Sequence, residues 1–152
     1  MELEFKPVVA GDIDRLRPFY GLRPNKTCDS VFLDSFLWKD YYHVQCAVSE
    51  GRAVLWLMEK DGQVSTAMPL CREEDLPYFF QQMVDYFSGV LHKPFYISLA
   101  DEEAVQCLNL DPALFEVEEQ VDLKDYLYSG EELRKLEGKK FVKKRNHLNG
   151  FK

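Results

Sequence analysis

The first half of the chain contains three consecutive stretches with the apolar pattern of β-strands. Two of them alternate apolar and polar residues, as a half-buried strand does, and the one between them is almost continuously apolar, as a strand buried on both faces is. The dipeptides Glu50-Gly51 and Asp61-Gly62 separate the three stretches and are typical of tight turns. We therefore predict an antiparallel meander of three strands, at residues 43–50, 52–60 and 63–70.

Helical spacing, with an apolar residue every three or four positions, marks much of the remaining chain. Asp12 is placed to cap a first helix, and Asp29 or Ser30 to cap a second. The third predicted helix opens with three acidic residues, which suit the positive end of a helix dipole. We predict helices at residues 11–22, 28–42, 73–91 and 101–108, and further strands at residues 3–8, 95–99, 114–121 and 124–129.

With a last helix in the basic segment that closes the sequence, the predicted element order is β-α-α-β-β-β-α-β-α-β-β-α. One mixed, largely antiparallel sheet flanked by helices accounts for this order, so the predicted fold class is α+β. The order resembles that of the N-acetyltransferase (GNAT) fold. Enzymes of that fold bind the pyrophosphate of an acyl carrier with a glycine-rich loop at a helix N-terminus.

The stretch at the corresponding position of this sequence is "PLCREEDLPYF", which contains no glycine. It places Glu73, Glu74 and Asp75 where the pyrophosphate would bind, so an anionic cofactor would meet like charge there. We therefore expect no cofactor in this chain, and in particular no binding of coenzyme A in the usual way.

Charge is distributed unevenly along the 152 residues. The net charge is −7, yet residues 131–152 carry eight Lys and Arg against three Glu. The acidic remainder would repel nucleic acid and anionic lipid, so binding of either has to come from the basic end. No apolar run approaches the ~20 residues of a transmembrane segment, and the N-terminus does not resemble a signal peptide. We expect a cytoplasmic protein with reduced cysteines.

The sequence carries no motif for metal binding or covalent catalysis. His43, His92 and His147 are far apart, and none stands at ligand spacing from a Cys, Asp or Glu. No nucleophile motif is present either. Aromatic residues gather within residues 32–42 and 78–87, where helical spacing favours core positions. They are more than one helix face can bury, which leaves some to face a second domain.

The basic segment at the end of the chain, residues 138–152, reads "GKKFVKKRNHLNGFK". Projected together with the preceding residues as one helix, Lys140, Lys144 and His147 fall in the same arc of roughly 140° as the apolar positions. Such a helix suits a place between two domains, with lysine stems buried and ammonium groups paired to carboxylates or to an anionic ligand.

Gly138 offers another arrangement, in which one helix ends at Glu137 and a second begins at Lys139. Three interpretations of the segment stay open from its residues. It is a solvated basic helix that offsets the acidic body, a connector that contributes to a cleft for an anionic substrate, or a free tail for nucleic acid or membrane.

Three stretches of the sequence resemble one family. They are "DSVFLDSFLWKDYYHVQCAV", "AMPLCREEDLPYFFQQMVDYF" and "DYLYSGEELRKLEGKKFVKKRNHLNGFK". Together they are similar to the N-terminal part of DUF2156 proteins, which are related to the C-terminal domain of phosphatidylglycerol lysyltransferases. The resemblance covers essentially the whole chain, and its most specific residues are Asp125, Tyr126, Tyr128, Leu133, Leu136, Gly138, Lys139, Lys144, Arg145, Asn146, His147 and Phe151.

The resemblance implies two GNAT-like domains in tandem. Residues 1–129 would form the first, and residues 130–152 a basic helical connector towards a second domain that follows Lys152. In the full protein the implied reaction is transfer of an activated acyl or aminoacyl group, and we expect this chain to be inactive alone. The alternative is a non-enzymatic binding or scaffold module of GNAT-like fold.

The same resemblance points to a substrate site in the basic segment. The implied ligand is an anionic donor, such as tRNA, acyl-CoA or a lipid headgroup. No catalytic residue is assigned, and no metal site. The candidate substrate-binding residues are Lys140, Lys144, Arg145, Asn146 and His147.

Overall fold

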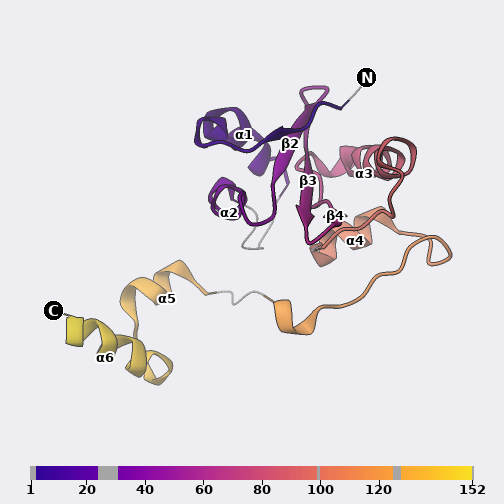
Figure 1. Ribbon diagram of the computed structural model, residues 1–152. Coiled ribbons are helices and arrows are strands. Elements are labelled where there is room, and N and C mark those ends of the chain that lie inside the picture. The colour runs from indigo at the N-terminus through magenta and orange to yellow at the C-terminus, as the bar shows by residue number, and fades with distance from the viewer. Residues whose placement is uncertain (1–2, 24–30, 99, 125–127, 152) are drawn as a thin grey trace. The chain divides into compact units, whose positions relative to one another are not determined.

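The computed structural model describes residues 3–23, 31–98, 100–124 and 128–151, drawn in colour in Figure 1. The chain divides into two compact units, residues 1–118 and 119–152. The predicted boundary after residue 129 falls inside the second of these units. The role predicted for residues 130–152, a connector between domains, stays a prediction.

The first unit is built on a four-stranded antiparallel sheet in the order β1-β2-β3-β4. Residues Glu50 and Gly51 between β2 and β3 both have positive φ, and so do Asp61 and Gly62 between β3 and β4. These are the conformations that tight hairpin turns require. The predicted meander is therefore confirmed, with β1 at Lys6–Pro7, β2 at Gln45–Ser49, β3 at Ala53–Lys60 and β4 at Gln63–Ser65.

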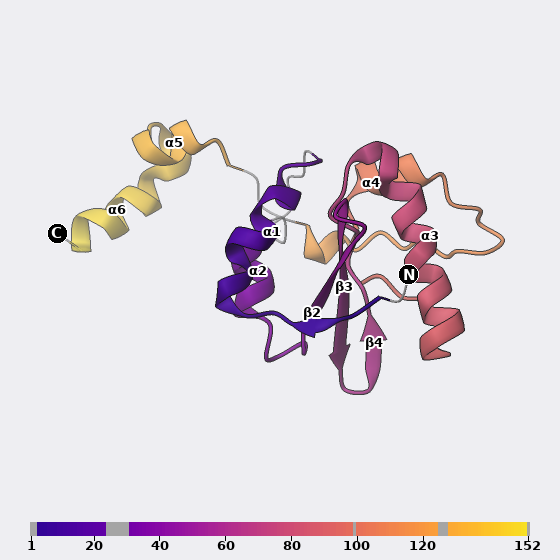
Figure 2. The same ribbon diagram turned by 90° about the horizontal axis from the view of Figure 1, so that it is seen from above.

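Helices cover both faces of this sheet. Figures 1 and 2 show α1 and α2 on one side of the strands and α3 and α4 on the other. The 3-10 turns η1 (Ala10–Asp12) and η2 (Glu73–Asp75) lead into α1 and α3, and α3 continues as a π-helical turn η3 (Phe87–Leu91). The helices are α1 at Ile13–Tyr20, α2 at Phe32–Leu37, α3 at Leu76–Tyr86 and α4 at Glu102–Leu108.

The core lies on both faces of β3, which explains why its sequence is almost continuously apolar. Leu55 belongs to the cluster under α3 and α4, together with the fully buried Phe79 and Phe87. Its neighbours Val54 and Trp56 point the other way and pack with Leu16 of α1. Successive side chains of a strand point to opposite faces, so both faces of β3 need apolar residues.

Three of the predicted elements differ from the structure. Residues 95–98 do not form a regular strand and make a single parallel bridge, Thr66 to Ile97. Residues 114–121 are irregular despite their alternating pattern, because no neighbouring strand among the described residues pairs with them, and Leu114 and Val117 are exposed. Within the described residues 31–42, the predicted helix at 28–42 is represented by α2, which is followed by turns.

Other predictions fall partly outside the described residues. These are the caps Asp29 and Ser30 and most of the predicted strand at 124–129. Asp12 does stand at the N-cap position of α1, but its side chain makes no capping hydrogen bond to that helix. Its carboxylate instead accepts a hydrogen bond at 2.9 Å from the amide of Val9, the residue before η1. The α+β class with an antiparallel sheet is confirmed. In the part of the chain that is described, no helix has both the length and the apolar character needed to cross a bilayer.

Candidate anion-binding segment

The second unit contains the basic segment and begins with a short 3-10 turn, η4 at Val121–Leu123. Helix α5 follows at Gly130–Lys135, with Ser129 as its N-cap: the Ser129 hydroxyl accepts a hydrogen bond from the Glu132 amide. Glu131 and Glu132 stand in the first turn and Arg134 and Lys135 in the last, as the helix dipole favours. The Lys135 ammonium lies 2.7 Å from the Glu131 carboxylate, one turn apart.

A tight turn ends α5 and leads into the basic helix. Leu136 adopts a left-handed conformation with φ 50°, and Gly138 has φ 83°, which only glycine adopts readily. The Leu136 side chain is nearly buried, and Phe141 is 2 % exposed. The turn then continues through η5 (Lys139–Phe141) into α6 (Val142–Phe151). This helix–turn–helix unit therefore has two buried apolar side chains at its turn.

Arg145 fixes the same turn from α6. Its guanidinium donates hydrogen bonds to the backbone carbonyl of Leu136 and, at 2.9 Å, to that of Gly138. Leu136 is the C-cap of α5 and Gly138 the N-cap of η5, so both carbonyls belong to the turn that joins the two helices. Arg145 is therefore engaged with the backbone of its own unit, a role that the sequence did not indicate.

The other predicted site residues have different surroundings. The Lys140 ammonium pairs with the Glu132 carboxylate at 2.7 Å, eight positions earlier in the chain. The Lys144 ammonium lies over the Tyr128 ring, 5.2 Å from its centroid, a cation–π geometry. Asn146 and His147 are exposed on α6. Whether these five residues bind a substrate stays a prediction.

The break at Gly138 that the sequence allowed is present, so the segment is not one helix. Of the apolar positions in the projected stripe, Leu136 and Phe141 are buried, but Leu148 is 53 % and Phe151 94 % exposed. The projection of a single helix was therefore wrong, because the left-handed residue at 136 and the turn after it reset the direction of the side chains.

Two lysines of the segment have no partner among the described residues. Neither Lys139 nor Lys143 makes an ion pair or hydrogen bond there, and both are exposed. Lys143 and His147 are one turn apart on α6 and so lie on one face. Both lysines belong to the basic run of the sequence but not to the candidate substrate-binding residues predicted from it. They are recognised only in the structure, because the structure shows which lysines are already paired with carboxylates.

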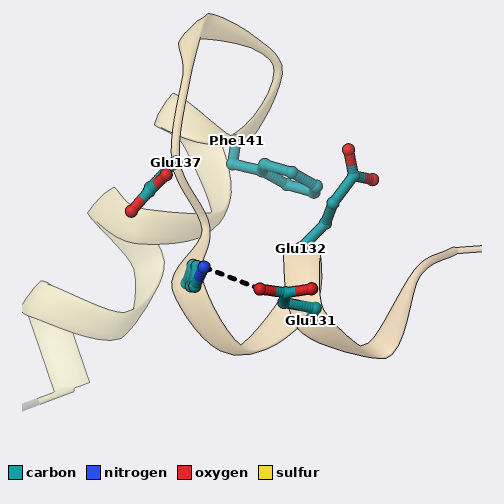
Figure 3. A pocket seen from close by; sticks show the side chains of 5 residues that line it. Glu131, Glu132, Glu137 and Phe141 are labelled. Atoms are coloured by element: carbon teal, nitrogen blue, oxygen red, sulfur yellow. Dashed lines mark hydrogen bonds and ion pairs between the residues drawn. The ribbon is translucent and has the colours of Figure 1, made fainter.

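A pocket of about 210 Å³ opens beside this turn. Figure 3 shows the Phe141 ring in the middle of the view, with the Glu132 and Glu137 side chains on either side and the ion pair of Glu131 below. Three carboxylates and one lysine line it, so its charge is the opposite of what a phosphate needs. It is also smaller than the ~300 Å³ typical of small-molecule sites. The pocket is therefore not the predicted anion site.

The first unit shows what occupies the region before α3, where coenzyme A was expected not to bind. The Arg52 guanidinium lies 2.7 Å from the Asp75 carboxylate and 2.7 Å from that of Glu50. The Tyr78 hydroxyl donates to Glu50 at 2.7 Å, and this bond, with the Arg52 pair, holds the pKa of Glu50 below its usual value. Asp75 is thus already paired to a cation of the protein itself.

The remaining candidate groups in the described part of the chain are metal-ligating side chains and free thiols. No group of three or more His, Cys, Asp or Glu is placed there to hold a metal ion. Cys46, Cys71 and Cys107 are free thiols. Burial raises the pKa of the Cys71 thiol to about 11, which keeps it protonated near neutral pH. Burial also raises the pKa of Cys46, although the Arg15 guanidinium 3.6 Å from its sulfur opposes the shift.

The basic helix–turn–helix unit, the strands β2 to β4 and the helices α2 to α4 all fall within one family match. A model of the family described as phosphatidylglycerol lysyltransferase, C-terminal, matches residues 21–152. The chain belongs to this family. Neither the curated proteins nor the solved structures compared with the chain gave a match.

Membership in the lysyltransferase family covers all three stretches on which the predicted resemblance rests. The match includes α5, the turn held by Arg145 and α6. It starts after α1, so β1 and α1 lie before it. The chain is therefore a lysyltransferase-related domain whose basic C-terminal unit is part of the family pattern.

Proposed function

We propose that this chain is the first GNAT-like domain of a tandem acyl- or aminoacyl-transferase-like protein, and that its basic unit helps to hold an anionic donor. The family match supports a transferase-related role. The observation that carries the donor-binding part is a pair of exposed cations without a partner in the described chain. They are Lys139 in η5 and Lys143, which lies one turn from His147 on α6. Exposed cations without internal partners are free to neutralise phosphate groups.

Within this proposal the predicted site residues divide into two roles. Lys144, Asn146 and His147 are exposed and join Lys139 and Lys143 in contacting the donor. Lys140 and Arg145 act by holding the turn, through Glu132 and the backbone carbonyls. The turn that carries these cations is already held in place, so less conformational entropy is lost when the donor binds.

The chemistry would be completed outside this chain. Acyl or aminoacyl transfer needs the donor carbonyl and the acceptor held together, hydrogen-bond donors aimed at the developing oxyanion, and a base for the acceptor. This chain contributes positioning of the donor's phosphates, and the catalytic groups belong to the second domain. On its own, this chain binds the donor but does not catalyse the transfer.

A binding titration tests the proposal. The 152-residue chain is titrated against fluorescent tRNA, acyl-CoA and vesicles containing anionic lipid, at several salt concentrations. We expect Lys139→Ala with Lys143→Ala to weaken binding of one donor and to reduce the salt slope by about one for each phosphate that the variant no longer neutralises. Lys135→Ala, which removes an ion-paired lysine of the same unit, is the matched control. Equal affinity of wild type and double variant for every donor contradicts the proposal.

The second candidate is a binding or scaffold module without transferase chemistry. The Arg52–Asp75 pair favours it, because the helix end that would take an acyl carrier's pyrophosphate is occupied. A transferase assay of the longest natural product, with charged tRNAs and acyl-CoA, separates the two. Turnover supports the enzyme, and absence of both turnover and donor binding supports the module.

A further inference from the structure

The side of α2 that faces away from the sheet carries a cluster of exposed apolar side chains. Phe32 and Phe36 face inward, and Phe32 packs against the core. Leu33 and Leu37, one turn apart, are 60 % and 66 % exposed, and the chain then turns through three half-exposed rings. We define the α2 patch as Leu33, Leu37, Trp38, Tyr41 and Tyr42.

The three aromatic rings of the α2 patch contact one another. The Trp38 ring contacts those of Tyr41 and Tyr42, with centroids 5.8 Å and 5.9 Å away, and the two tyrosines are 4.7 Å apart. The Lys60 ammonium lies 4.1 Å from the Tyr41 centroid. Rings held in this way lose little side-chain entropy when a partner covers them, and Trp and Tyr are enriched among residues that dominate binding energy.

Charge around the α2 patch argues against a polyanionic partner. Lys39 is paired with Asp40 at 2.7 Å, and Lys60 with Asp61 at 3.3 Å. The two aspartates are almost fully exposed, while the lysines are largely covered. Nucleic acid or an anionic bilayer would therefore meet carboxylates at the rim. The exposed charge at this rim is therefore mainly negative, and the part of the patch that a second copy can cover is its apolar surface.

The size of the α2 patch fits half of a dimer interface. Three rings of 150–250 Å² each, about half exposed, contribute about 300 Å² of apolar surface. The two leucines raise this to about 400 Å². Interfaces are roughly 60 % apolar, so a patch of this size corresponds to about 700 Å² per partner, close to the ~800 Å² of a standard stable interface.

We propose that the α2 patch is the interface through which two copies of this chain associate, around a two-fold axis. A two-fold contact places the same patch on both copies, so the Trp38 rings and the leucines of α2 cover each other. This association is independent of donor binding by the basic unit.

Sedimentation of the 152-residue chain across a range from about 1 to about 300 µM tests the proposal. We expect the mass to rise with concentration from one copy to two. Leu37→Glu places a charge in the centre of the patch, once in each copy, and should weaken dimerisation at least about tenfold. Leu114→Glu, at an equally exposed position outside the patch, is the matched control and should leave the mass unchanged.

A fluorescence measurement keeps the test valid if a variant fails to fold. Trp56 is 4 % exposed and Trp38 48 %, so acrylamide quenching of the wild type reports mainly on Trp38. We expect quenching to fall as concentration rises. A wild-type chain that stays monomeric throughout overturns the proposal, whether or not it binds vesicles or another domain through the patch. A dimer that persists in Leu37→Glu overturns it as well.

Discussion

The Arg23 guanidinium and the Asp101 carboxylate, 78 residues apart in sequence, form two parallel hydrogen bonds of 3.0 Å each. Both side chains are more than nine-tenths buried. Asp101 also caps α4, because its carboxylate accepts a hydrogen bond from the Ala104 amide at 2.8 Å. The pair thus ties the end of the segment after α1 to the start of a helix on the other side of the sheet.

Asp101→Asn should destabilise the protein by about 3 kcal/mol. Asparagine still caps a helix, so the loss comes from leaving the Arg23 charge buried without its partner. Urea unfolding measures the change. The control is Asp14→Asn, whose contact with Arg17 is exposed and 3.9 Å long, and which should cost under about 0.5 kcal/mol. A loss below about 1 kcal/mol for Asp101→Asn would show that the buried pair contributes little.

Arg145→Ala should loosen the turn between α5 and α6. A charged donor to backbone acceptors contributes about 1.5–3 kcal/mol, so amide hydrogens of α5 and α6 should exchange about ten times faster or more. Arg145→Lys should rescue this only in part, because an ammonium cannot reproduce the guanidinium fork. Lys143→Ala, a neighbour without a described partner, serves as the control. Unchanged exchange in Arg145→Ala is the contrary outcome.

The sheet could be predicted because the sequence patterns that specify its strands and turns each extend over only a few residues. Alternation in β2, the apolar run of β3 and the dipeptides at residues 50–51 and 61–62 each act over a few residues. The segment 114–121 carries an equally good strand pattern and is not a strand. Strand formation also needs a partner, and a pattern within one segment does not contain that information.

The candidate site shows the same limit. Its position in the basic segment follows from the family resemblance together with the clustered positive charge, and it stays a prediction. The engagement of Lys140 with Glu132 and of Arg145 with two carbonyls depends on the turn at Leu136, a left-handed leucine that no propensity favours. The Arg23–Asp101 pair could not be predicted from the sequence either, because its two residues are far apart in the chain and meet only in the folded structure.

The three described cysteines should differ in their reaction with iodoacetamide. At pH 8, Cys107 should be alkylated first, because it is partly exposed, while Cys46 and Cys71 are buried. The thiolate is the reactive form, and the pKa of Cys71 is raised to about 11 by burial, so its reaction should accelerate only as the pH approaches that value. Peptide mapping by mass spectrometry gives the order. Faster labelling of Cys71 than of Cys107 at pH 8 would contradict the burial.

The free energy of unfolding should also depend on pH through the Cys71 thiol, and it should fall as the pH rises. The pKa of Cys71 is about 11 in the folded chain against 9.0 ordinarily, so the unfolded state releases its proton first as pH rises. The contribution of the buried thiol is therefore intact below about pH 9 and is lost between about pH 9 and 11. Cys71→Ala should flatten this part of the urea-midpoint profile, and Cys107→Ala should leave it unchanged. Identical slopes in wild type and Cys71→Ala would rule out this assignment.

Coenzyme A should not bind to the 152-residue chain at the start of α3. The stretch before the helix has no glycine to bring backbone amides near a pyrophosphate, and Glu73 and Glu74 add negative charge there. Arg52, whose guanidinium contacts Asp75, is already held between Asp75 and Glu50. Calorimetric titration should therefore show no heat of binding.

A variant separates the two causes of this expected failure. Glu73→Gln combined with Glu74→Gln removes like charge but leaves the loop without glycine. If the missing backbone contacts are the main cause, this variant shows no heat of coenzyme A binding, as the wild type does. If charge repulsion dominates, weak binding appears in the variant alone, because the helix dipole then acts on the phosphate unopposed. Micromolar binding by the wild type would mean that a pyrophosphate is held by contacts other than a glycine-rich loop.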